Sequence, residues 1–349
     1  MRRRASSPLA TALLVPLLLV SGCGSANEPE PGESTPAATG DLPTVTGAFG
    51  EDPIVELPES DPGTELVVEV LEEGDGAEVA EGELLVADYL GQRWAPAADA
   101  SPAASESAST DASTTPDESV EDGAFDSTFA GGVPVSFGLS TDSILPGMLE
   151  GLVGQTVGSR VLVVIPPDQG FGEQGQPDLG IAPEDSLVFV FDLIDAFAGD
   201  AAAEGSAVEL TPDPAVPTVT SGESGPTLTV PSASPAPTEL VAQTLIEGAG
   251  DEVLAGQFLV VQYRGVLWKD GVEFDSSWSK GAPTGFPIGV GQVIPGWDTG
   301  LVGQTVGSQV LLVVPPAEGY GPEGRAPTIA GDDTLVFVVD ILGAYGEAA

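Results

Sequence analysis

The side chains of this sequence that could do chemistry are rings, hydroxyls and carboxylates, because the common nucleophile and metal-ligand sets are missing. The 349 residues include no histidine and one cysteine. Without histidine there is no Ser-His-Asp or Cys-His machinery and no imidazole metal site. A single cysteine excludes an intramolecular disulfide and any CxxC metal or redox motif. We therefore expect no metal and no cofactor. The tripeptide Phe-Asp-Ser, a ring followed by a carboxylate and a hydroxyl, occurs twice, at 125–127 and at 274–276.

The charge of the chain excludes a further class of function. Acidic residues number 54 and basic residues 9, which gives a formal net charge of −45 and a pI near 4.1. Binding to nucleic-acid phosphates requires clustered Lys and Arg. We therefore expect no nucleic-acid partner.

The first residues are typical of export. Three arginines at 2–4 precede an apolar run from Leu9 to Val20, which is too short to span a bilayer comfortably. The sequence VSGC at 20–23 resembles the bacterial lipobox. It predicts a signal peptide over 1–22, cleavage before Cys23 and lipid on the Cys23 sulfur, so that the protein is anchored to the membrane outside the cytoplasm. The alternative is an ordinary signal peptide with an incidental cysteine.

Composition divides the remaining chain. Pro, Gly, Ser, Thr and Glu dominate residues 23–63, which predicts a disordered tether. A second low-complexity stretch, 95–122, interrupts a patterned region and is interpreted as an insertion. A third, 199–237, is rich in proline and predicts an extended linker between independent domains. Two patterned blocks remain, 64–198 and 238–346, and each is predicted to be a domain.

The two blocks are repeats of each other. Residues 64–94 align without a gap on 238–268, and GLVGQTVGS occurs identically at 151–159 and 300–308. The change of offset between these matches corresponds to an insertion of about 25 residues in the first copy. Two copies are too few for a solenoid, so tandem domains are the simplest interpretation.

Each copy is predicted to consist mainly of strands. VLVVIPP at 161–167 and VLLVVPP at 310–316 are typical of buried strands that end at a pair of prolines. Between the strands, the sequence from Pro295 to Gly303 predicts one short helix, with Trp297 and Leu301 on one face. A helix this short needs a sheet to lie on. The predicted fold class is α+β, an antiparallel β-sheet wrapped around one short helix.

The second block resembles the FKBP-type peptidyl-prolyl cis-trans isomerases (rotamases) over essentially its whole length. The matching stretches are QYRGVLWKDGVEFDSSW, FPIGVGQVIPGWDTGLVGQTVGS, VVPPAEGYGPEG and TLVFVVDIL. The resemblance implies two FKBP-like domains, each with an apolar pocket that accepts a proline ring. Proline-containing polypeptides are the implied clients, and macrolides are further implied ligands.

The resemblance also implies the site residues of the second block. Trp297 would form the pocket floor, with Asp275 and Tyr320 as polar members. The implied lining consists of Tyr263, Phe274, Phe286, Val293, Ile294 and Phe337. Arg325 stands where the family often has a loop histidine, Ile329 falls on a lining position, and Thr284 replaces a residue that is commonly aromatic. Plain core packing is the alternative for each ring, and capping of the turn in DSSW is the alternative for Asp275.

The chemistry follows from the amide bond itself. Rotation about an X–Pro bond meets a barrier of roughly 20 kcal/mol, because resonance must be broken. The twisted amide has a less polar carbonyl and is favoured in an apolar enclosure. A pocket that binds it about 5.5 kcal/mol better than the planar isomers would accelerate exchange by about 10⁴. Aromatic walls and one or two hydrogen-bond donors could supply that preference.

The first copy keeps most of this pattern with two changes. Its equivalent residues are Tyr89, Phe125, Asp126, Phe137, Ile144, Leu145, Met148, Phe171 and Phe189. Met148 replaces the tryptophan of the floor, and Phe171 replaces Tyr320 and so lacks a hydroxyl donor. We expect a weaker isomerase in this copy.

Two functions of different classes remain open. The first is an exported, lipid-anchored isomerase that assists folding of secreted proteins, where slow X–Pro isomerisation limits folding. The second is a non-catalytic chaperone or scaffold that binds proline peptides. Four basic residues of the second block, Arg264, Lys269, Lys280 and Arg325, lie near the expected pocket rim. They either favour acidic segments of clients or are ordinary solvated charges.

Overall fold

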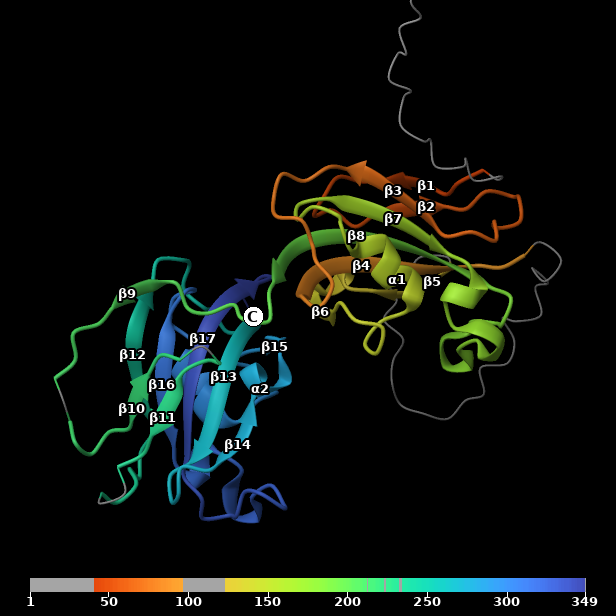
Figure 1. Ribbon diagram of the computed structural model, residues 1–349. Helices are drawn as coiled ribbons and strands as arrows, with labels where there is room; N and C mark the ends of the chain where they lie inside the picture. Colours follow the sequence, from red (N-terminus) through yellow and green to blue (C-terminus); the bar gives the residue numbers. More distant parts are fainter. Residues whose placement is uncertain (1–40, 97–122, 212, 223, 232–233, 349) are drawn as a thin grey trace, which may run out of the picture. The chain divides into compact units, whose positions relative to one another are not determined.

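The structure, a computed structural model, describes residues 41–96, 123–211, 213–222, 224–231 and 234–348 (Figure 1). The predicted signal peptide, Cys23 and nearly all of the predicted insertion lie outside the described residues. The described chain contains two large antiparallel sheets and two small hairpins. Each large sheet has a short helix against it, and we call the two units domain 1 and domain 2. This confirms the predicted fold class. Across the described ranges, no helix is long and apolar enough to cross a membrane.

The sheet of domain 1 has six strands. Their order is β3-β7-β8-β4-β5, with β6 also paired to β4. The bounds are β3 (Val67–Glu72), β4 (Leu84–Trp94), β5 (Ala124–Ser127), β6 (Val135–Gly138), β7 (Arg160–Ile165) and β8 (Ser186–Phe197). One α-helix, α1 (Pro146–Leu152), lies against β7. The remaining helical turns are short 3₁₀ segments at Phe129–Gly131, Pro167–Gln169, Gly172–Gln174 and Pro177–Leu179.

Domain 2 repeats this topology and adds one strand. The order is β14-β13-β17-β16-β12-β9, with β15 paired to β13. The bounds are β9 (Gly205–Ala207), β12 (Val241–Gly248), β13 (Phe258–Leu267), β14 (Glu273–Ser276), β15 (Thr284–Pro287), β16 (Gln309–Val314) and β17 (Leu335–Tyr345). The helices are α2 (Ser277–Lys280), α3 (Pro295–Leu301) and 3₁₀ turns at Pro316–Glu318 and Gly321–Glu323.

Helix α3 lies flat on β16 because its sequence permits close approach. Pro295 occupies the first turn, where the missing N–H costs nothing. A methyl group at Gly300 would stand 2.7 Å from the Leu312 side chain, closer than packed atoms come. By contrast, large side chains are needed four residues apart at Trp297 and Leu301, because both fill the core of domain 2. The helix is thereby fixed in one rotation, with the indole towards the inner face of the sheet.

The outer face of each sheet is covered as well, which the sequence analysis did not predict. Strands β1 (Thr44–Thr46) and β2 (Ile54–Glu56) form an antiparallel hairpin. Its Val45 and Val55 pack over a buried cluster on the outer face of the domain 1 sheet. That cluster consists of Trp94, Leu162, Val164, Val188 and Val190. The prediction of a disordered tether over 23–63 is therefore wrong for residues 44–56.

A buried ion pair fastens this hairpin to the sheet. The side chains of Arg160 and Asp192 are each 1% exposed, and Arg160 Nε lies 2.6 Å from Asp192 Oδ1. Arg160 also donates to the carbonyl oxygens of Gly47 at 2.8 Å and Glu51 at 2.6 Å. The N–H of Gly50 donates to Asp192 at 2.6 Å. The hairpin loop thus completes the hydrogen bonding that a buried ion pair requires.

The predicted proline-rich linker also contains ordered strands. Within 199–237, β9 pairs with β12, and β10 (Thr218–Thr220) pairs with β11 (Thr227–Thr229). Val219 and Leu228 pack over the outer face of the domain 2 sheet. Arg264 donates to the Pro226 carbonyl oxygen at 2.6 Å. The prediction of an extended spacer is therefore wrong for these strands. In β10 and β11, threonines alternate with an aliphatic residue, which supplies an apolar face that the sheet can bury.

Candidate active site

A cavity of about 500 Å³ opens on the inner face of the domain 2 sheet, beside α3. All nine residues predicted for the second copy line it: Tyr263, Phe274, Asp275, Phe286, Val293, Ile294, Trp297, Tyr320 and Phe337. Thr284 and Arg325 line it too, as do Gln292, Pro295 and Gly319, which the sequence analysis did not single out. The separate motifs of the second block therefore converge on one cavity.

Trp297 is both a core residue and a wall of the cavity. The residue is 6% exposed. Its ring lies edge to face with Tyr263 and with Phe337, at centroid distances of 5.2 Å each, and 5.3 Å from the ring of Phe286. The indole Nε1 is buried and has no hydrogen-bond partner among the described residues. Core packing and pocket lining are thus not exclusive alternatives for this residue.

Gly265 determines how two of the rings stand, and the sequence analysis missed it. Phe274 and Phe337 pack edge to face, with centroids 5.5 Å apart and planes at 89°. A methyl group on Gly265 would come within 2.7 Å of Phe274 and 2.8 Å of Phe337. Only glycine leaves room for both rings. The same relationship recurs in domain 1 between Gly91, Phe125 and Phe189, so the repeated glycine was a usable signal.

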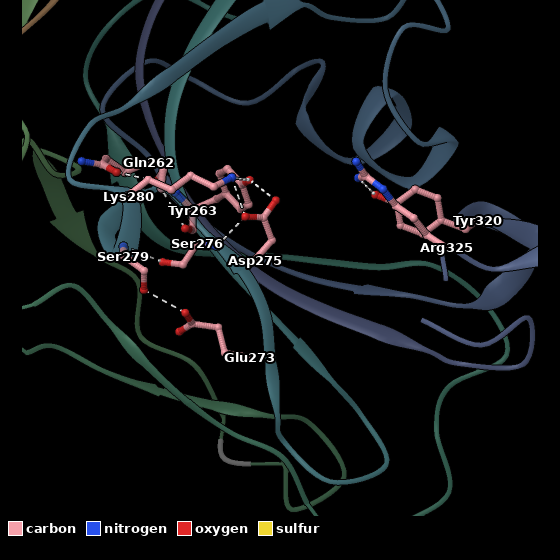
Figure 2. Close-up of polar contacts among 10 residues, drawn as sticks. Gln262, Tyr263, Glu273, Asp275, Ser276, Ser279, Lys280, Tyr320 and Arg325 are labelled. Atoms are coloured by element: carbon pink, nitrogen blue, oxygen red, sulfur yellow. Dashed lines mark hydrogen bonds and ion pairs between the residues drawn. The ribbon is translucent and has the colours of Figure 1, made fainter. Parts of the chain in front are cut away.

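The polar edge of the cavity is a three-residue network (Figure 2). Tyr263 Oη donates to Asp275 Oδ2 at 2.6 Å, and Lys280 Nζ lies 2.5 Å from Asp275 Oδ1. Asp275 also accepts from the Ser276 N–H at 2.9 Å, so the turn-capping and pocket roles fall on one carboxylate.

Folding shifts the pKa of Asp275 and the pKa of Tyr263, which are hydrogen-bonded to each other. Burial acts to raise the pKa of Asp275, but hydrogen bonds from Lys280 and Tyr263 and the Lys280 charge outweigh it and lower the pKa. Burial, and then the hydrogen bond to the Asp275 carboxylate, raise the pKa of Tyr263. At neutral pH Asp275 is therefore a carboxylate and Tyr263 a neutral phenol.

Tyr320 and Arg325 form a second polar group, separate from the first in Figure 2. Arg325 Nη1 donates to Tyr320 Oη at 3.1 Å, and the guanidinium lies 5.6 Å from the centre of the Tyr320 ring. Because the phenol oxygen accepts from Arg325, its own hydrogen is left for another acceptor. Tyr320 can thus donate to a substrate carbonyl from a fixed position.

Asp298 is a further positioning residue that the sequence analysis missed. Its carboxylate accepts from the N–H of Gly289 at 2.6 Å and of Gly291 at 2.9 Å. Both glycines have positive φ. The contacts tie the loop before Val293 and Ile294 to the first turn of α3, which fixes that wall of the cavity.

Ile329 lies in the core of domain 2 and not at the lining position that the family resemblance implies. The residue is 6% exposed and belongs to the core of domain 2, and it is not among the lining residues. The reason is a backbone clasp: the Arg325 N–H donates to the Ile329 carbonyl at 2.8 Å, and the Ile329 N–H returns the bond at 3.0 Å. The clasp leaves Arg325 exposed at the cavity and Ile329 in the core.

Domain 1 has a matching cavity of about 420 Å³. All nine predicted equivalents line it: Tyr89, Phe125, Asp126, Phe137, Ile144, Leu145, Met148, Phe171 and Phe189. Met148 from α1 is 6% exposed, like Trp297. Tyr89 donates to Asp126, but Gly131 stands where domain 2 has Lys280. The lining includes Asp126 and Asp142 and no basic residue.

Within the described ranges, no three Cys, Asp or Glu side chains are grouped so as to hold a metal ion. Among the described residues, the polar side-chain groups of the cavity linings are amides, hydroxyls, carboxylates, one indole N–H and one guanidinium. Such an arrangement can enclose a ligand and donate hydrogen bonds to it.

Comparison with known proteins agrees with this geometry. A family model described as FKBP-type peptidyl-prolyl cis-trans isomerase matches residues 112–194 and 250–342. An FK506-binding protein of Streptomyces anulatus is 41% identical over 118 residues, covering 34% of this chain and 94% of the relative. A probable FK506-binding protein of Corynebacterium glutamicum is 42% identical over 110 residues, covering 32% of this chain and 91% of the relative.

Longer relatives and solved structures match as well. Human peptidyl-prolyl cis-trans isomerase FKBP10 is 29% identical over 225 residues, covering 64% of this chain and 32% of that protein. The crystal structure of FkpA from Escherichia coli is 34% identical, with a TM-score of 0.29, and covers 37% of this chain and 52% of that one. With two matched segments that together span half of its residues, the chain belongs to the FKBP-type peptidyl-prolyl cis-trans isomerase family.

Proposed function

We propose that the protein is an exported, lipid-anchored peptidyl-prolyl cis-trans isomerase that assists the folding of secreted proteins, with most of its activity in domain 2. The observation that carries the assignment to domain 2 is the cavity floored by Trp297 and edged by the Tyr320 hydroxyl. Isomerase activity itself follows from the family.

The cavity suits the twisted amide better than the planar one. A proline ring would pack on the Trp297 indole, while Phe274, Phe286 and Phe337 keep water from the bond. As the amide twists, resonance is lost, and its less polar carbonyl gains from the apolar walls. Tyr320 would donate to a neighbouring carbonyl and hold the chain while it rotates. Asp275, held in place by Tyr263 and Lys280, would contribute to the electrostatic field at the other polar edge of the cavity.

Domain 1 would bind clients and isomerise them more slowly. Phe171 keeps the ring of Tyr320 but has no hydroxyl to donate, and Met148 offers a flexible floor in place of the indole. These two differences favour a client-binding role for this half of the protein. They also make domain 1 a matched internal reference for domain 2.

Macrolides would occupy the domain 2 cavity. The relatives from Streptomyces and Corynebacterium are named FK506-binding proteins. The cavity here offers a comparable chemistry, an apolar enclosure with a few hydrogen-bond donors and acceptors at its edge. A macrolide should therefore compete with proline peptides for domain 2.

A protease-coupled assay on a proline tetrapeptide tests the assignment to domain 2. Trp297→Leu in the full chain should lower kcat/KM about tenfold, because about 1.4 kcal/mol of ring packing is lost. Met148→Leu is the matched control, since it changes the equally buried residue of α1, and should leave kcat/KM within about twofold. Equal losses in the two variants would contradict the assignment, and so would full activity in Trp297→Leu. Far-ultraviolet circular dichroism reports whether each variant is folded.

Lipid anchoring is tested separately. The lipobox-like sequence VSGC and the arginines before it support attachment at Cys23. Cys23→Ser should abolish labelling by a radioactive fatty acid and release the exported protein from the membrane fraction. Unchanged labelling and membrane association would contradict the proposal for Cys23 and leave the isomerase assignment untouched.

A further inference from the structure

Arg325 is the one cation of the described chain that has no carboxylate partner. Five other basic residues are described, and each lies within 3.6 Å of an acidic side chain. These pairs are Arg93–Asp185, Arg160–Asp192, Arg264–Glu273, Lys269–Asp333 and Lys280–Asp275. Three of the four basic residues of the second block are thus neutralised, and only Arg325 offers a free positive charge.

That charge is held in place at the cavity. The backbone of Arg325 is fixed by two hydrogen bonds to Ile329, and its side chain by the Tyr320 hydroxyl and ring. Only Nη1 of the guanidinium has a partner among the described residues, and that partner is neutral. Since a guanidinium carries five N–H donors, most of them are left for a ligand. Arg325 also lines the cavity wall.

Domain 1 has no positive charge at the position equivalent to Arg325. Gln176 occupies the equivalent position and forms the same kind of backbone bridge, to Ile181. The domain 1 cavity is lined by two carboxylates, Asp126 and Asp142, and by no basic residue. In domain 2 the only lining carboxylate, Asp275, is already paired with Lys280. The lining of the domain 1 cavity therefore carries two negative charges, whereas in domain 2 Arg325 and Lys280 together outweigh Asp275.

We infer that Arg325 is a specificity residue, which selects clients with an acidic side chain next to the proline and presents them to domain 2. A carboxylate beside the prolyl ring would reach the free donors of the guanidinium while the ring lies on Trp297. Domain 1, with its acidic rim, disfavours the same clients. The inference rests on the proposed function for the site of binding, and it adds the class of sequence that the site prefers.

The test uses the full chain and peptides that differ only in charge. Ala-Xaa-Pro-Phe and Ala-Pro-Xaa-Phe peptides, with Xaa as Glu, Gln or Lys, are assayed for kcat/KM and for binding through the Trp297 indole N–H resonance. Arg325→Gln introduces the residue that domain 1 has at this position, and Arg325→Lys keeps the charge. Lys269→Gln is the matched control, because it removes one exposed positive charge away from the cavity.

The expected result is a preference for Glu over Gln of about two- to fivefold at one or both peptide positions, the range for an exposed ion pair. Salt should weaken this preference. Arg325→Gln should abolish it, Arg325→Lys should retain part of it, and Lys269→Gln should leave it unchanged. For each variant, the ratio of kcat/KM for the Glu peptide to kcat/KM for the Gln peptide is compared. A general effect of the substitution on Tyr320 would change both values alike and so would not change this ratio.

Failure of the inference and failure of the proposed function give different results. If the Gln peptide is turned over normally but the Glu to Gln ratio is the same in wild type and Arg325→Gln, the inference is overturned and the isomerase proposal stands. If peptides bind with the expected charge preference but are not turned over, the inference holds and catalysis by domain 2 fails. Binding without any charge preference overturns the inference, and absence of both binding and turnover overturns both.

Discussion

The Tyr263 hydroxyl donates to Asp275 across 2.6 Å, and Lys280 pairs with the second oxygen of the same carboxylate. The cavity edge therefore has a carboxylate whose two oxygens are both occupied before any client arrives. Domain 1 keeps the Tyr89–Asp126 hydrogen bond without the lysine. Because of that difference, this edge of the cavity contains an ion pair in domain 2 and only a hydrogen bond in domain 1.

Asp275→Asn should lower the melting temperature at pH 6 by a few degrees, because a partly buried ion pair worth up to about 1 kcal/mol is lost. Folding lowers the pKa of Asp275 below its ordinary 3.8. The stabilisation is therefore present above that value and is lost as the pH falls through the folded-state pKa. Calorimetry at pH 6 and at about pH 2 should show the difference between wild type and variant disappear in acid. Asp251→Asn, at an exposed acid, is the charge control, and an equal loss there would contradict the prediction.

Exchanging Tyr320 and Phe171 should move activity between the domains. Tyr320→Phe removes one hydroxyl donor and should lower kcat/KM about fivefold, the equivalent of about 1 kcal/mol for one hydrogen bond. Phe171→Tyr supplies the donor in domain 1 and should raise the residual activity measured in a Trp297→Leu background. The assay is the protease-coupled one. A Tyr320→Phe enzyme with unchanged kcat/KM would show that the hydroxyl does not act on the substrate.

Gly265→Ala should disturb the aromatic wall. The added methyl group would lie within 2.8 Å of both Phe274 and Phe337, so the rings must move, at a cost of about 1 to 3 kcal/mol. We expect a lower melting temperature and weaker peptide binding together. Gly131→Ala is the control, since a methyl group there meets nothing within 4 Å. Wild-type stability in Gly265→Ala would mean that the rings have more room than their positions indicate.

Arg160→Gln should loosen the N-terminal hairpin. Removing the guanidinium leaves the buried Asp192 carboxylate without its ion partner, which costs about 3 kcal/mol. Hydrogen exchange should become faster at the amides of residues 44–56. Arg93→Gln removes a pair that is longer, at 3.6 Å, and more exposed, so it should cost less than about 1 kcal/mol. Similar exchange in the two variants would contradict a fastening role for Arg160.

The residues that line the domain 2 cavity could be named from the sequence because they sit in several separate motifs whose order and spacing resemble those of the family. The pairing of β13 with β14 brings Asp275 within hydrogen-bond reach of Tyr263. Asp298 and Gly265 were missed for a physical reason. Each acts on other residues, by holding a loop or by making room, and neither carries a side chain that would touch a proline ring.

The hairpins on the outer faces of the sheets could not be located from the sequence, although one apolar strand indicated that a cover exists. The run at 161–165 is apolar on both faces, which requires a cover on each side of the sheet. Nothing in that run says what the cover is. The covering strands are three residues long and contribute little more than Val45 and Val55 in domain 1. Such short apolar patterns are lost among the surrounding Pro, Gly and acidic residues.

The hairpin of domain 1 also gives the two faces of its sheet separate coverings. It covers the outer face of the sheet, whereas α1 and the cavity lie on the inner face. Strands β1 and β2 therefore lie behind the sheet of domain 1, on the side turned away from its cavity. Loss of the hairpin would therefore uncover the apolar outer face of the sheet, Trp94 included, while the rings around the cavity kept their own contacts.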